Sequence, residues 1–450
     1  MAFGDLLRRL GVPYLVTPHG GPDGPATGLP CYKAPDLASA LLLAEAEGSM
    51  GAGLGAVLDG EVLTLLSRPV VLGEPTGVAS AEALLAAAAD ARRRGAGGLA
   101  VRLEFDLSDL VGARHDSADD HADPSLAARL TPSGTAGPCS DVTLVDFALV
   151  GRGVFRTGGA PAVRAFAERT GVGVLNTFTT KGLFRWDSPF HLGTGCLQEQ
   201  DLVLAGAHPD AVILTIGVDA DECPDALFAA AGFDPGRAIG VAVDGLGEAA
   251  RTFRARVPVG GERGRLYREL GAVAQPLYPL ENAPLNPARA AADIAAVLPE
   301  NASVWVEPGP AGMWLARALP TTRFGSARVP AAGTAGVAVA GALSAALRPG
   351  GVGVAVLDEP PRSGAVATLL EWASSAPGTV VVEVWGGRGG LRCAQEHRER
   401  LAAVLARPGV SVLEVPVDYS ATTALLEAAG PVVAWRGPAA AASSTSPDIR

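Results

Sequence analysis

Two turns in the last third of the chain hold the residues best suited to binding a cofactor. The apolar run "VGVAVL" is followed by Asp358, Glu359 and two prolines, and the run "TVVVEV" is followed by Trp385 and the pair Gly386 and Gly387. Carboxylate oxygens like those of the first turn can bind a cation such as Mg²⁺, whereas glycines offer no side-chain ligand. Because ligands of α/β proteins collect at the carboxyl ends of parallel strands, we expect a cofactor at these two turns.

Three other places carry groups that could do chemistry, and each also has a simpler structural interpretation. His19 follows Pro18 at the expected edge of the first sheet, where it could act as an acid or base or simply belong to a turn. The segment "DADEC" (219–223) offers carboxylates and a thiol, but its place after an apolar run predicts a solvated loop. The segment "GRGVFRTGG" (151–159) lacks the full G-x-G-x-x-G pattern, so we expect a strand-to-helix turn, with nucleotide binding as the alternative.

Apolar runs typical of strands alternate with Ala- and Leu-rich helical segments along the whole chain. This alternation predicts an α/β fold made of three doubly wound parallel-sheet units. We place these units at residues 1–110, 141–275 and 276–435, with a polar linker at 111–140 and a disordered tail at 436–450.

Two elements of the first unit can be predicted in more detail. The segment "APDLASALLLAEAEG" predicts a helix with Pro35 in its first turn and Gly48 just past its end. The segment "GLAVRLEFDL" (98–107) alternates apolar and charged residues, which predicts a strand with one wet face near the edge of a sheet.

Composition and charge exclude several classes of function. The formal net charge of −11 argues against a broad face that binds nucleic acid or an anionic membrane. The five cysteines form no CxxC pair, so the sequence predicts neither a zinc ribbon nor a disulfide framework. The start of the chain lacks the pattern of a secretory signal, and no long uncharged apolar run predicts a membrane span, so we expect a cytoplasmic protein.

The central unit carries the clearest likeness to a known family. The stretch "GVGVLNTFTTKGLFRWDSPFHLGTG", followed by "DAVILTIGVDADE", resembles the middle domain of thiamine-diphosphate-dependent enzymes of the acetolactate synthase type. The positions that match the pattern of that domain are Thr177, Lys181, Gly182, His191, Gly193 and Gly217.

The likeness extends outward on both sides of this unit. The opening "RRLGVPYLVTPHG" resembles the first segment of the family, and "VWVEPGPAGMW" resembles the start of its pyrophosphate-binding domain, with Glu307 and Gly309 on the family pattern. The resemblance implies that the three units are a pyrimidine-binding-like, a central and a pyrophosphate-binding-like domain. The chain is short for such an enzyme, with stretches missing from the first and third units.

Four features of the family's cofactor chemistry lack a counterpart in this sequence. In the family a glutamate activates the pyrimidine ring, a bulky apolar side chain props the bent cofactor, and a Gly-Asp-Gly turn and an asparagine bind Mg²⁺. Aligned by eye, "HE" at the start of the family's first-unit helix falls on Tyr32 and Lys33, so that Lys33 replaces the glutamate, and an ammonium cannot accept a hydrogen bond. The cofactor-binding positions implied by the resemblance, most of them degenerate, are His19, Gly309, Thr334, Ala335, Asp358, Glu359, Gly386 and Gly387.

These losses predict a non-catalytic or repurposed homologue that has lost the magnesium site, has no cofactor of its own and acts with a partner. The alternative is an active thiamine-diphosphate-dependent 2-oxo acid decarboxylase or carboligase, with Asp358 or Glu359 binding Mg²⁺ and an unusual activation route around Lys33. The resemblance implies a homodimer or homotetramer, or a hetero-oligomer in which a related full-length enzyme supplies the missing carboxylate.

Overall fold

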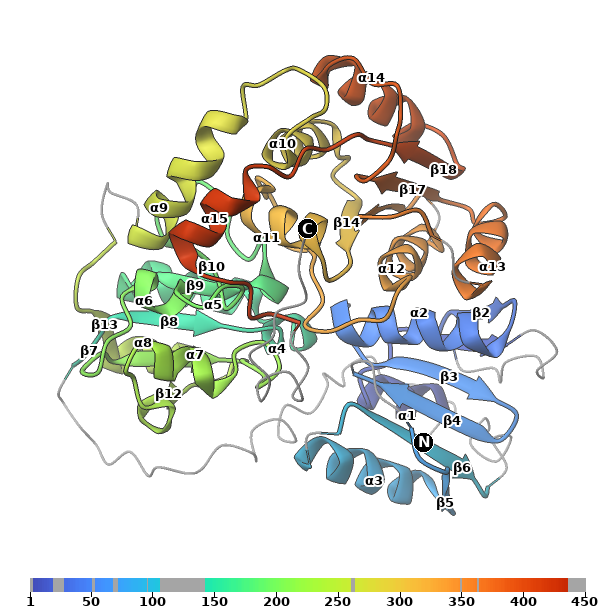
Figure 1. Cartoon of the computed structure of the whole chain (residues 1–450). Coiled ribbons are helices and arrows are strands. Elements are labelled where there is room, and N and C mark those ends of the chain that lie inside the picture. The colour runs from blue at the N-terminus through green and yellow to red at the C-terminus, as the bar shows by residue number, and fades with distance from the viewer. Residues whose placement is uncertain are drawn as a thin grey trace.

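The computed structural model describes residues 3–18, 28–50, 53–67, 72–94, 96–105, 142–259, 264–348, 350–361 and 364–435. Within them the chain forms three large sheets, each with helices packed against it (Figure 1). The predicted linker at 111–140, the predicted tail at 436–450 and His19 lie outside the described residues.

The first unit holds a six-stranded sheet. Its strands, in spatial order, are β2 (Cys31–Ala34), β1 (Leu15–Pro18), β3 (Gly55–Asp59), β4 (Val62–Leu66), β6 (Gly98–Leu103) and β5 (Thr76–Val78), and its helices are α1 (Phe3–Arg9), α2 (Leu37–Met50) and α3 (Ala81–Arg93). Strand β4 runs antiparallel to both β3 and β6, so this sheet is mixed rather than wholly parallel as predicted. The reason is the two-residue connection Gly60–Glu61, which permits a hairpin but is far too short for a parallel crossover. Strand β6 lies next to the edge strand, as its alternating pattern predicted.

Helix α2 differs from its prediction at its end. Asp36 caps its start by accepting a 2.7 Å hydrogen bond from the Ser39 amide. The helix then runs through Gly48 to Met50, so the predicted end at Gly48 was wrong. A β-carbon at position 48 would overlap the Leu66 carbonyl oxygen, so Gly48 is required for the close approach of α2 to β4 rather than for ending the helix.

The central unit holds a five-stranded, fully parallel sheet, as predicted. Its order is β10 (His191–Gly195), β9 (Val174–Thr177), β8 (Phe147–Val150), β11 (Ile213–Ile216) and β12 (Ile239–Gly240). The helices of this unit are α4 (Gly153–Arg156), α5 (Ala160–Thr170), α6 (Asp201–Ala205), α7 (Asp225–Ala230), α8 (Leu246–Thr252) and α9 (Arg265–Ala274), and a small two-stranded sheet joins β7 (Thr143–Val145) to β13 (Phe253–Ala255).

The third unit holds another five-stranded parallel sheet. Its order is β15 (Ala327–Arg328), β14 (Ala302–Val306), β16 (Val352–Leu357), β17 (Thr379–Val384) and β18 (Gly409–Glu414). Its helices are α10 (Pro287–Val297), α11 (Pro310–Ala318), α12 (Val337–Ala346), α13 (Gly364–Ala373), α14 (Ala394–Leu405) and α15 (Thr422–Ala429). Helices α12 and α13 cover one face of the sheet, and α10, α11 and α14 cover the other.

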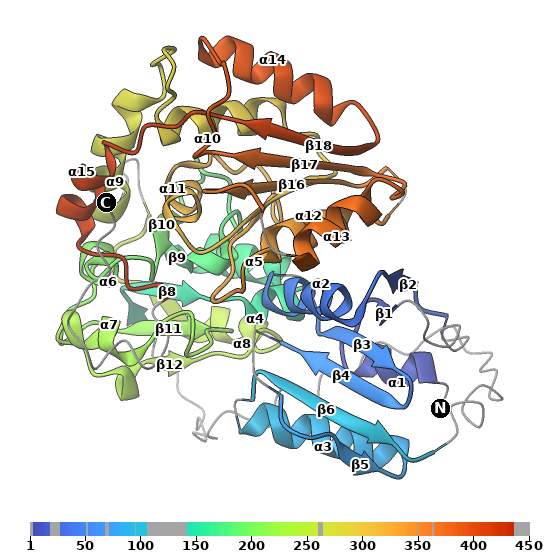
Figure 2. The same ribbon diagram turned by 45° about the vertical axis from the view of Figure 1, so that its right-hand side comes forward.

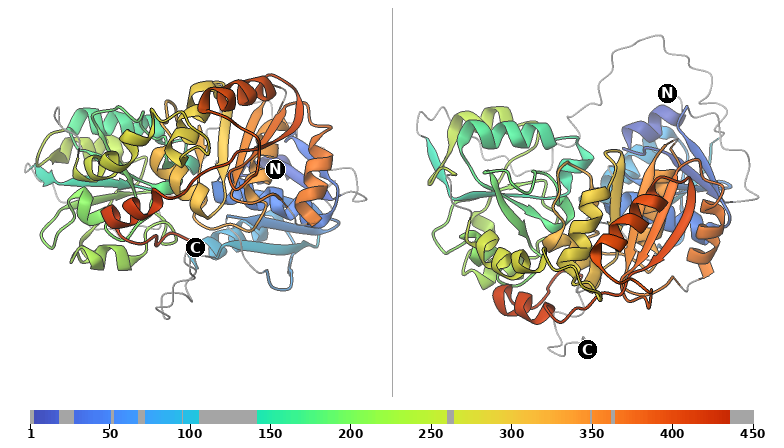
Figure 3. Two further views of the ribbon diagram at one scale, coloured as in Figure 1. Left: turned by 45° about the horizontal axis from the view of Figure 1, so that its top comes forward. Right: turned by 90° about the horizontal axis from the view of Figure 1, so that it is seen from above.

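The three units share cores with one another. Helix α2 of the first unit lies against α12 of the third (Figure 2), and Leu43 and Val337 belong to one apolar cluster between them. The last helix, α15, leaves the third unit and packs beside α9 (Figure 3). There the Gln198 side-chain amide donates a 3.0 Å hydrogen bond to the Leu425 carbonyl, which attaches α15 to the central unit.

Candidate functional site

The carboxyl ends of β14, β16 and β17 lie side by side, as the predicted strands require. In the parallel register Val306 pairs with Val356, and Leu357 pairs with Val384. The residues that follow these strands, which include Glu307, Asp358 and the glycine pair, therefore gather at one edge of the third sheet. Helix α2 of the first unit packs on α12, whose N-terminus lies at this edge (Figure 1).

The carboxylate of Asp358 lies on the N-terminus of helix α11. Its Oδ1 accepts a 2.9 Å hydrogen bond from the Ala311 amide and a 2.8 Å hydrogen bond from the Tyr419 hydroxyl. Burial raises the pKa of Asp358, although the two hydrogen bonds favour its charged form. Gly309 has a φ of +155°, and a β-carbon there would overlap the Asp358 carboxylate, so glycine is required for this close contact.

The carboxylate of Glu307, which follows β14, lies on the N-terminus of helix α12 in the same way. Its Oε1 accepts a 2.6 Å hydrogen bond from the amide of Gly336, which is the N-cap residue of α12. Burial raises the pKa of the Glu307 carboxyl; the helix amides oppose this effect, and the nearby carboxylates of Asp358 and Glu45 add to it. Two helix N-termini at this edge therefore already hold a carboxylate of the chain itself.

The first unit contributes a third carboxylate to the same region. Glu45, a buried residue of α2, accepts hydrogen bonds of 2.8 Å from the amide and from the hydroxyl of Thr334. The next residue, Ala335, is exposed in the loop before α12. These contacts bring predicted site residues of the first and third units together, and they give the edge a surplus of negative charge.

The glycine pair after β17 sits in a tight space. The Gly386 amide donates a 3.0 Å hydrogen bond to the Asp358 carbonyl, and a β-carbon at position 386 would overlap that same oxygen. A β-carbon at position 387 would lie 2.6 Å from the Glu414 β-carbon. Side chains that could bind a metal ion therefore cannot be placed here without moving the backbone. Glu359 lies next to Asp358 but is exposed.

Lys33 lies elsewhere than the alignment suggested. We expected Tyr32 and Lys33 to open a helix, but both belong to strand β2, and α2 begins only at Leu37. The Lys33 side chain is exposed. The sequence does not distinguish this strand from the start of the helix, because its four residues show no apolar alternation.

The central unit holds a buried carboxylate at the ends of its own strands. Glu222 accepts hydrogen bonds from the Arg152 amide at 3.0 Å and from the hydroxyls of Thr177 and Thr179 at 2.6 Å each. Burial raises the pKa of Glu222 to about 7; the Asp219 carboxylate adds to this effect, and Arg152 and the threonines oppose it. The solvated loop predicted at 219–223 was therefore wrong for Glu222, which is fully buried, while the strand-to-helix turn predicted at 151–159 is confirmed.

The remaining motif residues of the central unit fall into two groups. Gly217 lies against Gly153 at the ends of β11 and β8, where β-carbons would collide. Lys181, His191 and Gly193 line a cavity at the edge of β10. Sequence spacing alone gives no sign of this cavity, because its walls also come from α9, which is distant in the sequence, and from the third unit.

The described residues contain no cluster of three or more His, Cys, Asp or Glu side chains arranged to hold a metal ion. None of the described helices is long and apolar enough to cross a membrane.

Comparison with known proteins agrees with this architecture. Residues 147–270 match the sequence family described as the thiamine pyrophosphate enzyme central domain. No curated protein sequence matches the chain.

Two solved structures resemble the chain over most of its length. One is a protein from Mycobacterium smegmatis described as a candidate thiamin diphosphate-dependent enzyme, with 18% identity, a TM-score of 0.54, and coverage of 92% of this chain and 98% of that chain. The other is benzoylformate decarboxylase from Polynucleobacter necessarius, with 16% identity, a TM-score of 0.55, and coverage of 92% and 97%. Residues 147–270 thus match the central domain of thiamine pyrophosphate enzymes, and the whole chain has the fold of the two solved structures.

Proposed function

We propose that this chain is a non-catalytic or repurposed homologue of the thiamin diphosphate-dependent enzymes, which does not bind thiamin diphosphate with Mg²⁺ in their usual way. The observation that carries the proposal is the placement of Asp358 and Glu307 on the N-termini of α11 and α12. A diphosphate held at the carboxyl edge of a parallel sheet relies on helix amides of this kind. Here carboxylates of the chain take the place of the anion.

Charge strengthens this argument. A diphosphate entering the edge would meet three carboxylates, those of Glu45, Glu307 and Asp358. Like charges in a partly buried site repel one another strongly, because water screens them poorly there. The residues of this edge therefore do not fit a diphosphate ligand.

A bridging cation is the usual remedy for such repulsion, but the two turns at this edge offer it few side-chain ligands. Mg²⁺ requires near-octahedral oxygen ligands. Gly386 and Gly387 provide no side-chain oxygen and have no room for one, and the side chains of Pro360 and Pro361 carry no oxygen either. The alternative of an active decarboxylase or carboligase would need Asp358 to leave Ala311 and Tyr419, or Glu359 to turn inward from solvent.

Isothermal titration calorimetry of the full chain with thiamin diphosphate and Mg²⁺ tests the proposal. We expect no binding in the micromolar range. A Kd in that range, lost when Mg²⁺ is omitted, would contradict the proposal. Assays of pyruvate consumption by the wild-type chain and by Lys33→Glu give a second test, in which we expect no turnover from either protein.

We further propose that the chain acts with a partner, as an oligomer of itself or together with a related full-length enzyme. The support is chemical, because the described residues offer no cluster of His, Cys, Asp or Glu side chains for a metal ion, so a partner would have to complete such a site. Light scattering coupled to size exclusion will give the mass of the particle. A strictly monomeric protein that also fails to associate with a purified full-length homologue would contradict this part of the proposal.

A further inference from the structure

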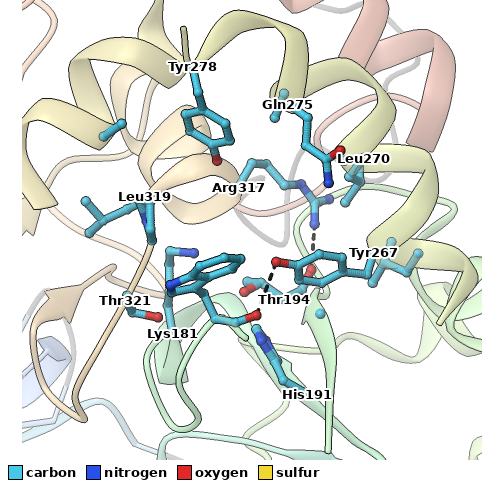
Figure 4. A pocket seen from close by; sticks show the side chains of 17 residues that line it. Lys181, His191, Thr194, Tyr267, Leu270, Gln275, Tyr278, Arg317, Leu319 and Thr321 are labelled. Carbon is cyan, nitrogen blue, oxygen red and sulfur yellow. Dashed lines mark hydrogen bonds between the residues drawn. The ribbon is translucent and has the colours of Figure 1, made fainter. Parts of the chain in front are cut away.

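A cavity of about 430 Å³ lies between the central and third units, and Asp358 is not among the residues that line it (Figure 4). Its walls come from β10, α9, the end of α11 and the segment 319–321. This volume lies within the range of small-molecule sites, which is about 300–1,000 Å³. Apolar and aromatic side chains form most of the lining, among them Trp186, Leu266, Tyr267, Leu270, Tyr278 and Leu319.

Lys181 is the charged group in this cavity that lacks a partner. Its side chain points into the space and is only 5% exposed (Figure 4). No residue in the described part of the chain forms a hydrogen bond or an ion pair with its Nζ. Burial, with a smaller contribution from Arg317, lowers the pKa of Lys181 to about 7. A buried ammonium without a counter-ion is costly, so an anion that enters the cavity gains by pairing with it.

The second cation, Arg317, is already engaged. Its guanidinium forms a 2.6 Å ion pair with Asp201 and donates hydrogen bonds to the Thr194 carbonyl at 2.6 Å and to the Gln198 side-chain oxygen at 3.0 Å. These contacts hold the Arg317 side chain in place, and the Asp201 carboxylate balances its charge. Taken together, the cavity can neutralise one negative charge at Lys181.

The aromatic residues present their rings to the space. The Tyr267 hydroxyl donates to the Trp186 carbonyl at 3.1 Å, and the Tyr278 hydroxyl donates to the Ala318 carbonyl at 2.8 Å. Both hydroxyls are thereby engaged with the backbone, and the ring faces remain as apolar walls. Trp186 is 42% exposed, so the cavity opens to solvent beside its indole ring.

We propose that this cavity binds a small apolar monocarboxylate, best fitted by an aromatic acid, and that Lys181 pairs with its carboxylate. The single negative charge matches the one unbalanced ammonium, and the apolar body matches the aromatic and aliphatic walls. A phosphate or a dicarboxylate would bring a second negative charge that Arg317, already paired with Asp201, does not offset.

Calorimetric titration with phenylacetate tests this proposal, with phenylacetamide as the neutral compound of the same shape. At pH 7 we expect phenylacetate to bind to the full chain with a Kd of about 0.1 mM or tighter. Phenylacetamide should bind at least about tenfold more weakly, because it carries no negative charge to pair with the Lys181 ammonium. At pH 8, titrations in buffers of different ionisation enthalpy should show proton uptake on binding, because the carboxylate favours the protonated amine.

Two variants separate the site from the rest of the molecule. Lys181→Met keeps the length and apolar body of the side chain and should weaken phenylacetate binding at least about tenfold. Leu270→Trp keeps Lys181 but fills the space, and it should also abolish binding. Circular dichroism will verify that both variants are folded. Equal affinity of the wild type and Lys181→Met would overturn the proposal, as would failure of phenylacetate, benzoate and hexanoate alike to bind the wild type.

Discussion

The backbone amide of Ala311 donates a 2.9 Å hydrogen bond to the carboxylate of Asp358. This contact joins the first turn of α11 to the turn after β16. It also places a carboxylate of the chain at the N-terminus of α11, where the helix dipole favours negative charge. The same arrangement recurs one helix away, where Glu307 accepts from the Gly336 amide. The N-termini of both helices therefore already donate to a carboxylate of the chain.

Asp358 should accordingly contribute to stability. We expect Asp358→Ala to lower the free energy of unfolding by about 1–3 kcal/mol, because the Ala311 amide and the Tyr419 hydroxyl lose their acceptor in a partly buried site. Urea denaturation will measure the change. Glu359→Ala is the matched control, since that neighbouring carboxylate is exposed, and its effect should stay within about 0.5 kcal/mol. Equal effects of the two substitutions would contradict this role of Asp358.

The lack of space at Gly386 gives a second prediction. Gly386→Ala should destabilise the chain by about 1–3 kcal/mol, because the new methyl group would overlap the Asp358 carbonyl oxygen. Gly390→Ala is the control in the same loop, since a β-carbon there meets no atom within 4 Å. Denaturation curves should show a clear loss for the first variant and little change for the second. A Gly386→Asn protein as stable as the wild type would contradict the lack of space at this position.

The chain has only two lysines, Lys33 and Lys181, which makes their titration easy to follow. In protein labelled with ¹³C at the lysine ε-carbon, the Lys181 signal should titrate with a midpoint near pH 7, because burial disfavours its ammonium form. Lys33→Arg will assign the two signals by removing one of them. A Lys181 signal that titrates only at the ordinary pKa of lysine would contradict the buried, unpartnered amine.

His397 predicts a pH dependence of stability. It lies between the buried carboxylates of Asp293 at 3.0 Å and Glu383 at 3.1 Å. Burial opposes its charge, but the two carboxylates outweigh burial and raise the pKa of His397 to about 9. Because this pKa lies above the ordinary value of 6.5, the stabilisation is fully present below about pH 6.5 and is lost as the pH rises through about 9.

Comparison of the wild type with His397→Gln isolates this group, since other titrating groups are common to both proteins. The difference in the free energy of unfolding should be about 2–4 kcal/mol larger at pH 6 than at pH 10. His208→Gln serves as the control, because His208 is exposed. A difference between the wild type and His397→Gln that does not change with pH would rule out a charged His397 in the folded chain.

The sequence allowed the order of the elements and the central sheet to be predicted, because these depend on local patterns. The apolar runs at Val352–Leu357 and Thr379–Val384 are strands, and their turns meet at one edge, as parallel pairing requires. The antiparallel β4 could have been predicted from the short "DGE" turn at 59–61, which is typical of a hairpin. The predicted place of Lys33, at the start of a helix, was wrong because a strand of four residues shows too little apolar alternation to be recognised.

The contacts that define the sites could not be predicted, because the partners are distant in the sequence. The sequence places Glu222 in a loop, but Thr177 and Thr179 donate hydrogen bonds to it from the end of β9 and the turn that follows. The partners of Asp358 come from α11 and from Tyr419, and no spacing rule joins them. Likewise, the burial of Lys181 depends on walls supplied by another unit.

A crystal structure of the chain grown with excess thiamin diphosphate and Mg²⁺ is the most direct test of the central claim. We predict that Asp358 will remain bonded to the Ala311 amide and that no diphosphate will lie at the ends of β14, β16 and β17. Electron density for a diphosphate and its cation on the N-terminus of α11, with Asp358 displaced or ligating the metal, would contradict the account.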